Sequence, residues 1–209
     1  MKNIAHLKFN ELAPDLELET AEGGRIRLSS LWEKHVLVLA FTRHFGCPQC
    51  KEMLDQLVVS KAALAEKGIT LAVVTQAEPQ SARVFCDQYA QGVLCLADPD
   101  RKAYTAYGLG RGTLRQTVLS WKVLRSNARL KKARGWKPEM PPAGQDAMQM
   151  SGTFIIGTDG RIRLPYYYED IADHPSVELL LNGVMGMDWG KPFESAIEPE
   201  GRTDRRTMP

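Results

Sequence analysis

Cysteine is scarce in this sequence, and long apolar runs are missing. The chain has four cysteines in 209 residues. Residues 1–15 lack the apolar stretch of a signal peptide, and no later segment approaches the length of a membrane-spanning helix. We therefore expect a cytoplasmic protein whose thiols stay reduced. In that setting we expect the four cysteines not to build a structural disulfide framework.

The chain also has little excess charge. Its 27 Lys and Arg and 25 Asp and Glu leave a net charge of +2, so we expect neither nucleic acid nor a membrane as a partner. Residues 118–137 are more basic than the rest. We interpret the cations there as the solvated face of an inserted helix. The alternative is that they bind an anionic thiol cofactor, a nucleic acid or an acidic membrane surface. These cations are Lys122, Arg125, Arg129, Lys131, Lys132, Arg134 and Lys137.

The most informative motif is Cys47-Pro48-Gln49-Cys50. It follows a strongly apolar run at residues 35–41 and opens a helical pattern. The free N–H groups at the start of a helix stabilise a thiolate, and the second cysteine lies one turn on, close enough to form a disulfide. A C-x-x-C beside a strand–helix–strand pattern is typical of a thioredoxin-like redox site.

The other two cysteines, Cys86 and Cys95, bear on the alternatives to redox chemistry. A zinc site built on the motif needs a second ligand pair, and their spacing does not supply one, so we expect no metal. The other alternative for the motif is that Cys47 and Cys50 are two inert cysteines of the core. We expect Cys86 and Cys95 themselves to be buried free thiols that pack as small apolar residues. Cys86 is the alternative candidate for a resolving thiol.

Strand-like and helix-like patterns alternate along the chain. Polar–apolar alternation around a Gly-Gly pair predicts an N-terminal hairpin, and near-continuous apolar runs predict central strands covered on both faces. The predicted strands are residues 15–19, 25–28, 35–41, 69–75, 93–97, 153–156 and 161–167. The predicted helices are residues 50–68, 79–91, 98–107 and 118–133, and a last helix capped by Asp173 or His174 with Pro175 in its first turn.

This order predicts an α/β fold of the thioredoxin-like type, a sandwich with a central mixed sheet flanked by helices and an N-terminal β-hairpin. We expect one domain over residues 1–190, with a variable insert at about 111–148, and a polar C-terminal tail over residues 191–209. Parallel strands joined by right-handed crossovers put the helix starts at the carboxyl edge of the sheet. Cys47 falls at that edge, where the active sites of open α/β sheets lie.

Several segments resemble a known family. They are FTRHFGCPQC at 41–50, AYTAYGLG at 103–110, QMSGTFIIGTDG at 149–160, Asp173-His174-Pro175 and the opening FNELAPDLELETAEGGRIRLSSL. Together they look like the peroxiredoxin-like branch of the AhpC/TSA superfamily, over about residues 7–182. The resemblance implies thiol-based redox chemistry, with Cys47 as the matching reactive cysteine. We expect no cofactor.

The sequence departs from typical peroxiredoxins at three places. Those proteins carry a proline seven residues before the reactive cysteine and a threonine or serine three before it. Here the two positions are Ala40 and His44. Their second active-site arginine lies just before the strand that contains Thr153, and residues 148–152 include no arginine.

Arg43 and His44 are the candidate supporting residues. Arg43 lies four residues before Cys47, where its charge would lower the pKa of the thiol or bind an anionic group. His44 would act as a base for the same thiol. The alternative for Arg43 is an ordinary loop arginine without a role at the thiol. The alternative for His44 is a histidine that forms a hydrogen bond without chemical effect.

Three functions remain open at this point. In the first, Cys47 reduces a peroxide, Cys50 resolves the sulfenic acid to a disulfide, and an external thiol such as thioredoxin or glutathione reduces that disulfide. In the second, the pair exchanges with a disulfide in a protein or a small molecule. In the third, the fold and motif serve only redox sensing or binding. The resemblance favours the first, with a homodimer as one candidate assembly.

Overall fold

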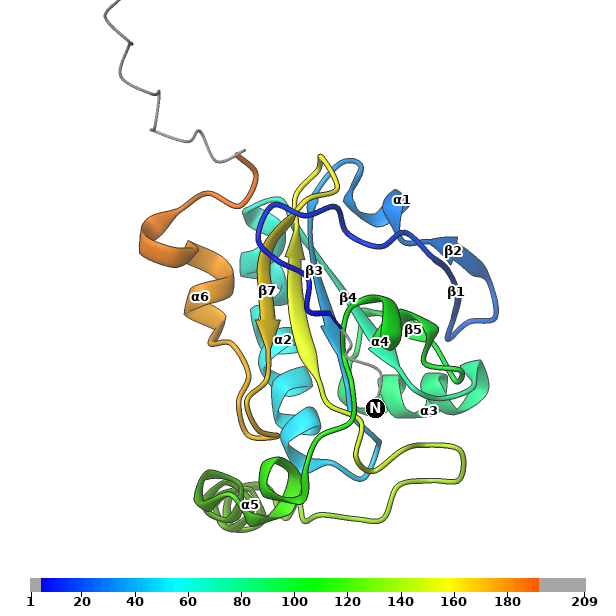
Figure 1. Cartoon of the computed structure of the whole chain (residues 1–209), viewed down its shortest axis with the longest axis vertical. Helices are drawn as coiled ribbons and strands as arrows, with labels where there is room; N and C mark the ends of the chain where they lie inside the picture. The colour runs from blue at the N-terminus through cyan, green and yellow to red at the C-terminus, as the bar shows by residue number, and fades with distance from the viewer. Residues whose placement is uncertain (1–4, 192–209) are drawn as a thin grey trace, which may run out of the picture.

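A seven-stranded mixed sheet forms the centre of the protein (Figure 1). The computed structural model describes residues 5–191. Strand order across the sheet is β2-β1-β5-β4-β3-β6-β7, in which β3, β4 and β5 are parallel and the other pairs are antiparallel. The strands are β1 Glu17–Thr20, β2 Arg25–Arg27, β3 Val36–Phe41, β4 Ile69–Thr75, β5 Leu94–Ala97, β6 Gly152–Ile156 and β7 Ile162–Tyr167. The predicted α/β sandwich and its N-terminal hairpin are confirmed.

Helices cover both faces of this sheet (Figure 1). In β3, Val38 and Ala40 pack into the core beneath α2, α3 and α6, whereas Leu39 and Phe41 pack beneath α1 and α4. A strand covered on both faces is apolar at every position, which explains the unbroken apolar run in the sequence. The helices are α1 Ser29–Trp32, α2 Pro48–Glu66, α3 Pro79–Tyr89, α4 Lys102–Ala106, α5 Trp121–Arg134 and α6 Val177–Asn182, with a π-helical turn η1 Arg115–Leu119 and a 3-10 turn η2 Val184–Gly186.

The turn between β3 and α2 lies at the carboxyl edge of the parallel strands. β3 ends at Phe41, and α2 begins at Pro48, whose fixed φ suits the first helical position. α2 then crosses back over the sheet, and the chain enters β4 beside β3. The position expected for Cys47, at the edge where α/β proteins form their sites, is therefore confirmed.

The segment predicted as one helix over residues 118–133 is divided in two. Ser120 has an extended backbone, with ψ of 135°, so η1 ends before it and α5 starts after it. α5 lies at the edge of the molecule beside the first turns of α2 (Figure 1). Two hydrogen bonds of 2.5 and 2.7 Å from Arg129 of α5 to Glu52 of α2 hold the two helices together.

The last helix starts later than predicted. Neither Asp173 nor His174 is its cap; α6 begins at Val177, after Ser176. The Ser176 hydroxyl accepts a hydrogen bond from the backbone N–H of Leu179 at 3.2 Å. A side-chain oxygen that satisfies a free N–H of the first turn defines the start of a helix.

The expectation of free thiols at Cys86 and Cys95 was wrong. Both side chains are buried, as expected, but their sulfurs are joined in a disulfide between α3 and β5. The fold lays α3 along β5 and brings the two cysteines together, which a spacing of nine residues does not reveal. Cys47 and Cys50 are the free thiols of the described chain. In this state Cys86 is therefore not available to resolve Cys47.

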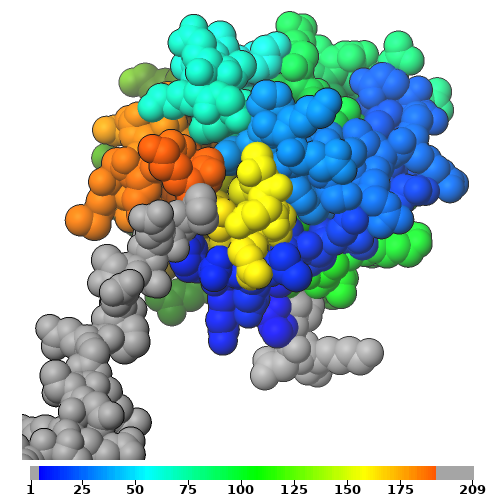
Figure 2. All heavy atoms as spheres, turned by 90° about the horizontal axis from the view of Figure 1, so that it is seen from above, coloured from blue at the N-terminus to red at the C-terminus, as the bar shows by residue number. Residues whose placement is uncertain are grey.

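The end of the sheet opposite Cys47 is closed by the turn between β6 and β7. Figure 2 shows this turn, in yellow, between the blue N-terminal residues and the orange segment after α6. Backbone hydrogen bonds of 2.8 Å run from Asn10 to Ile162 and from Ala13 to Gly160. The tail predicted over residues 191–209 lies outside the described residues, except for Lys191.

Candidate active site

Cys47 and Cys50 lie together at the start of α2. Cys47 is the residue that precedes the helix, with an extended backbone (ψ of 112°), and Cys50 lies in the first turn. Their side chains are buried, at 1% and 4% exposure, and each thiol affects the pKa of the other. The backbone N–H of Arg43 donates to the Cys50 sulfur at 3.3 Å. One helical turn thus forms the pair that the spacing predicted.

The two thiols differ in acidity. Burial by itself raises the pKa of Cys47, but the hydrogen bond from the Cys50 thiol and the charge of Arg43 outweigh burial and hold that pKa below its ordinary value. Hydrogen bonding to Cys47, burial and the negative charge of Cys47 hold the pKa of Cys50 well above its ordinary value. Cys47 is therefore the more acidic thiol and ionises first, whereas Cys50 keeps its proton.

Arg43 is brought to Cys47, as the sequence predicted. Its side chain is buried, and Nη1 lies 3.6 Å from the Cys47 sulfur. Nε donates to the carbonyl oxygen of Gln149 at 3.0 Å, and Nη2 donates to that of Ala147. The guanidinium group therefore has a fixed orientation, with one nitrogen at the reactive sulfur and two on a distant backbone segment.

His44 lies next to the site, but its environment does not suit a base. Burial, followed by the charge of Arg43, lowers the pKa of His44 to about 4. The imidazole is therefore neutral near pH 7 and a weak proton acceptor. Its Nδ1 is buried without a hydrogen-bond partner. The carbonyl of His44 accepts the Cys47 N–H at 3.0 Å, so the residue helps to shape the turn before α2.

A backbone segment lies against the turn that carries the reactive thiol. We call residues 136–149, between α5 and β6, the strap. Glu139 N–H donates to the Gly46 carbonyl at 3.0 Å, and the Gln145 side chain accepts the Phe45 N–H at 2.9 Å. Both bonds lie within two residues of Cys47. The strap is therefore bonded to the turn that carries this buried sulfur.

Three glutamines also shape the site, and none was a predicted site residue. Gln76 donates to the Arg43 carbonyl at 2.7 Å and to the Asp146 carbonyl at 3.0 Å, which ties the strap to β4. Gln149 donates to backbone carbonyls of the turn after α4. Gln49 contacts Cys47 directly, at 3.6 Å from its sulfur. Gln49 was visible within the motif, whereas the other two reach the site only through tertiary packing.

The basic cluster of residues 118–137 lies mostly on the outer side of α5. Arg129 pairs with Glu52, and Arg134 pairs with Asp55 at 2.6 Å. These pairs join α5 to α2, and so two of the cations have a structural use. The remaining cations of the cluster are exposed; they are Lys122, Arg125, Lys131, Lys132 and Lys137.

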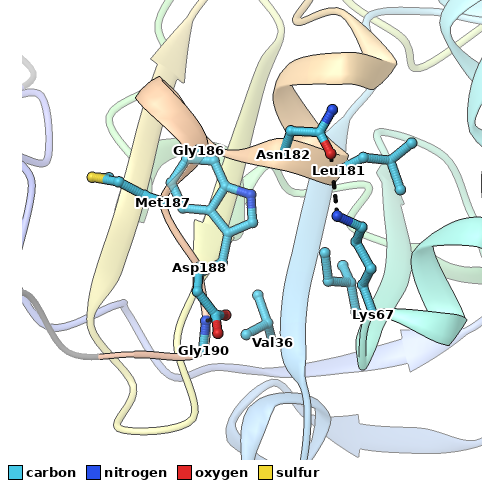
Figure 3. A pocket seen from close by; sticks show the side chains of 10 residues that line it. Val36, Lys67, Leu181, Asn182, Gly186, Met187, Asp188 and Gly190 are labelled. Atoms are coloured by element: carbon cyan, nitrogen blue, oxygen red, sulfur yellow. Dashed lines mark hydrogen bonds between the residues drawn. The ribbon is translucent and has the colours of Figure 1, made fainter.

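Other features of the described chain lie away from the thiol pair. A pocket of about 570 Å³ is lined by Val36, Lys67, the end of α6 and residues after it, with Lys67 bonded to Asn182 at 3.1 Å (Figure 3). Val36 is the first residue of β3, so this pocket lies a strand's length from Cys47. Residues 5–191 contain no cluster of three side chains able to hold a metal ion. Over the same residues, no helix combines the length and apolarity that crossing a membrane requires.

Known proteins share this sequence pattern and this fold. The pattern of the AhpC/TSA family matches residues 9–164, well over half of the chain. Peroxiredoxin-like 2C from Mus musculus is 26% identical over 172 residues, which cover 80% of this chain and 76% of that protein. The peroxidoxin BcpB from Mycobacterium tuberculosis has a similar structure, with a TM-score of 0.55 and 20% identity over 75% of this chain and 83% of that one. A peroxiredoxin-like protein from Aquifex aeolicus gives a TM-score of 0.59 and 16% identity over 85% and 86% of the two chains. The chain belongs to the AhpC/TSA family, as a peroxiredoxin-like member with a thioredoxin-like fold.

Proposed function

We propose that this protein is a thiol-dependent peroxide reductase. The Cys47 thiolate attacks the peroxide oxygen that carries a proton, the O–O bond breaks, and the other oxygen takes a proton from the solvent and leaves as water or an alcohol. Cys47 becomes a sulfenic acid. The Cys50 sulfur then attacks the Cys47 sulfur, the S–O bond breaks, and hydroxide takes the Cys50 proton and leaves as water. The product is a Cys47–Cys50 disulfide, and an external thiol such as thioredoxin or glutathione returns two electrons and two protons.

The contact between Arg43 and Cys47 is the observation that supports this proposal most. Negative charge develops on the leaving oxygen as the O–O bond breaks. A fixed cationic donor beside the attacking sulfur stabilises that charge more in the transition state than in the ground state. Nη1 of Arg43 lies 3.6 Å from the sulfur, and the lowered pKa of Cys47 supplies the nucleophile.

Thiol–disulfide exchange is a second candidate, which the surroundings of Gln149 favour. Gln149 lies in the segment where typical peroxiredoxins have a second arginine. Its side-chain N–H groups donate to backbone carbonyls and are therefore not directed at a substrate. A peroxide therefore meets fewer donors than in those proteins. An attacking thiolate and a proton-bearing partner one turn away are also what disulfide exchange requires. Either reaction needs the strap to open, since Cys47 is only 1% exposed.

Two assays on one preparation separate the candidates. Consumption of hydrogen peroxide and of an alkyl hydroperoxide is followed with thioredoxin or glutathione as reductant, and insulin disulfide reduction is followed in parallel. The proposal expects peroxide turnover that Cys47→Ser abolishes, with little insulin reduction. The reverse pattern would establish disulfide exchange. Activity in neither assay would favour a redox-sensing or binding role. The cytoplasmic location and the homodimer stay predictions.

A further inference from the structure

Gln49 faces the reactive sulfur from within the motif. Its side chain is 2% exposed, and its amide oxygen accepts a hydrogen bond from the Cys47 thiol at 3.6 Å. Its amide nitrogen donates to the side-chain oxygen of Asn127 at 2.7 Å, and the Ser126 hydroxyl lies 3.5 Å from the same nitrogen. Asn127 and Ser126 belong to α5. A helix from the segment predicted as a variable insert thus reaches the reactive thiol through one side chain.

This orientation of the amide suits a thiol and not a thiolate. A thiol donates a hydrogen bond, whereas a thiolate only accepts one. An amide oxygen that faces the sulfur stabilises the protonated form, and an amide N–H in the same place stabilises the ionised form. The nucleophile is the ionised form of Cys47. The Gln49 amide therefore supports the nucleophile only after a half-turn that exchanges its oxygen and nitrogen.

The partners on α5 permit that half-turn. Asn127 carries the same pair of groups as Gln49, so a matching half-turn of its own amide places a donor opposite the Gln49 oxygen. The Ser126 hydroxyl both donates and accepts. Gln49 then keeps a hydrogen-bond partner on its α5 side in either orientation, which matters because a buried polar group without a partner is costly.

We propose that Gln49 and Asn127 form an amide pair that reverses its hydrogen-bond polarity when Cys47 ionises, so that α5 positions the reactive thiolate. The inference rests on Cys47 being the nucleophile, as the proposed function requires. Gln49 and Asn127 are positioning residues in this scheme. α5, predicted only as part of a variable insert, is then a component of the active site.

The charged groups around the pair act on Cys47 independently of this reversal. Arg43 and Cys50 contact the sulfur directly. The other titratable groups around the site are His44, Lys51, Glu52, Arg129, Glu139 and Asp146, together with Tyr104 and Tyr168 near Cys50. Among the described residues, none of these eight has a hydrogen bond to the Gln49 or Asn127 side chain. A change confined to the amide pair is therefore separable from a change in these charges.

Two substitutions at Asn127 test the proposal by the sign of their effects. Asn127→Asp offers only acceptors, so it holds the Gln49 nitrogen toward α5 and the Gln49 oxygen toward Cys47. We expect an upward shift of about one unit in the pKa of Cys47, and hence about tenfold slower alkylation at pH values below that pKa. Asn127→Leu removes the hydrogen bond that fixes the Gln49 amide and adds no acceptor. We expect the pKa of Cys47 in this variant to stay at or below that of the wild type. The readout is the pH profile of iodoacetamide labelling of Cys47, followed by peptide mapping.

Two controls separate the amide pair from the added charge. Ala128→Asp places the same charge one residue away on the exposed side of α5, and we expect it to leave the profile unchanged. In a Gln49→Met background, Asn127→Asp has no amide to act through, so its effect should vanish. An effect that persists in that background would overturn the inference, as would equal slowing by Asp and Leu at position 127.

The same labelling experiment distinguishes this inference from the proposed function. If Cys47 is not the faster-labelled of the two free thiols in the wild type, the proposed function fails, and the inference fails as well because it depends on that function. If Cys47 labels fast but Asn127→Asp leaves its profile unchanged in a protein with a wild-type thermal transition, only the inference fails. Gln49→Glu, which removes the donor within the motif itself, provides a second variant. It should raise the pKa of Cys47 at least as much as Asn127→Asp, and an unchanged profile would count against the inference.

Discussion

Gly46 lies directly against the backbone of Glu139. A Cβ atom at position 46 would stand 2.3 Å from the Glu139 carbonyl oxygen and 2.8 Å from its carbonyl carbon, both closer than real contacts allow. The Glu139 N–H donates to the Gly46 carbonyl at 3.0 Å, so two backbone segments meet here without a side chain between them. Closure of the strap over Cys47 therefore depends on glycine at this position.

Gly46→Ala should loosen the strap and expose Cys47. The added methyl group meets backbone, which does not yield as a flexible side chain does, and overpacking of this kind costs about 1–3 kcal/mol. We expect labelling of Cys47 by N-ethylmaleimide to become at least severalfold faster than in the wild type. Gly24→Ala is the matched control, because its Cβ would only touch the Thr20 hydroxyl at 3.6 Å. Equal labelling of the wild type and a folded Gly46→Ala protein would show that the strap does not limit access.

Arg43→Met should shift the pH profile of Cys47 labelling upward. The charge of Arg43 favours the thiolate, so its loss raises the pKa of Cys47 toward the value of about 8.5 for a free cysteine. Peroxide oxidation of Cys47 should slow by on the order of 10²-fold, the scale for loss of one transition-state donor. Stopped-flow oxidation of the reduced protein measures the rate.

Arg43→Lys is the companion variant for this experiment. Lysine keeps the charge but cannot reach the sulfur and the carbonyls of Ala147 and Gln149 together, so we expect an intermediate rate. An unchanged rate in a folded Arg43→Met protein would move the electrostatic role to backbone N–H groups and would strengthen the case for disulfide exchange.

Cys50→Ser should allow Cys47 to react once and then stop. Without the resolving sulfur, the oxidised Cys47 remains a sulfenic acid or a mixed disulfide with the external thiol. Dimedone trapping and mass spectrometry of the variant, compared with the wild type, detect that species. Turnover at the wild-type rate would exclude Cys50 as the resolving residue. The next candidate would then be Cys86, after reduction of its disulfide with Cys95.

Acid should weaken the fold through Glu52. Burial raises the pKa of Glu52, but hydrogen bonds from His174 and Arg129 outweigh burial and lower that pKa to about 2. The unfolded value is about 4.3. Because the folded pKa is the lower one, this stabilisation is fully present above about pH 4.3 and is lost as the pH falls toward 2. Urea unfolding at pH 6, 4 and 3 measures the free energy of unfolding.

Glu52→Gln should flatten the part of this pH dependence that comes from residue 52. Glu66→Gln, an exposed position at the end of the same helix, is the control and should keep the wild-type slope. If the free energy of unfolding of Glu52→Gln falls with pH as steeply as that of the wild type, the acid sensitivity comes from other carboxylates.

The sequence by itself determined the sheet, the helix that follows β3 and the reactive pair. Apolar runs and helical spacing are local properties, so they identify β3, β4 and α2 without knowledge of the rest of the chain. Cys47 directly precedes α2 and Cys50 lies in its first turn, so their proximity also follows from local geometry. The position of Cys47 at the sheet edge follows from the order of strands and helices.

Only the tertiary structure decided what surrounds that pair. Arg43 and Gln149 are 106 positions apart, and Gln49 and Asn127 are 78 apart. Even Cys86 and Cys95, nine residues apart, meet only because α3 packs along β5. Such contacts depend on how whole elements pack, and on which way each side chain then points. A local sequence pattern predicts neither the packing of elements nor the direction of a side chain. The strap, the environment of His44 and the contact with α5 could therefore be identified only from the tertiary structure.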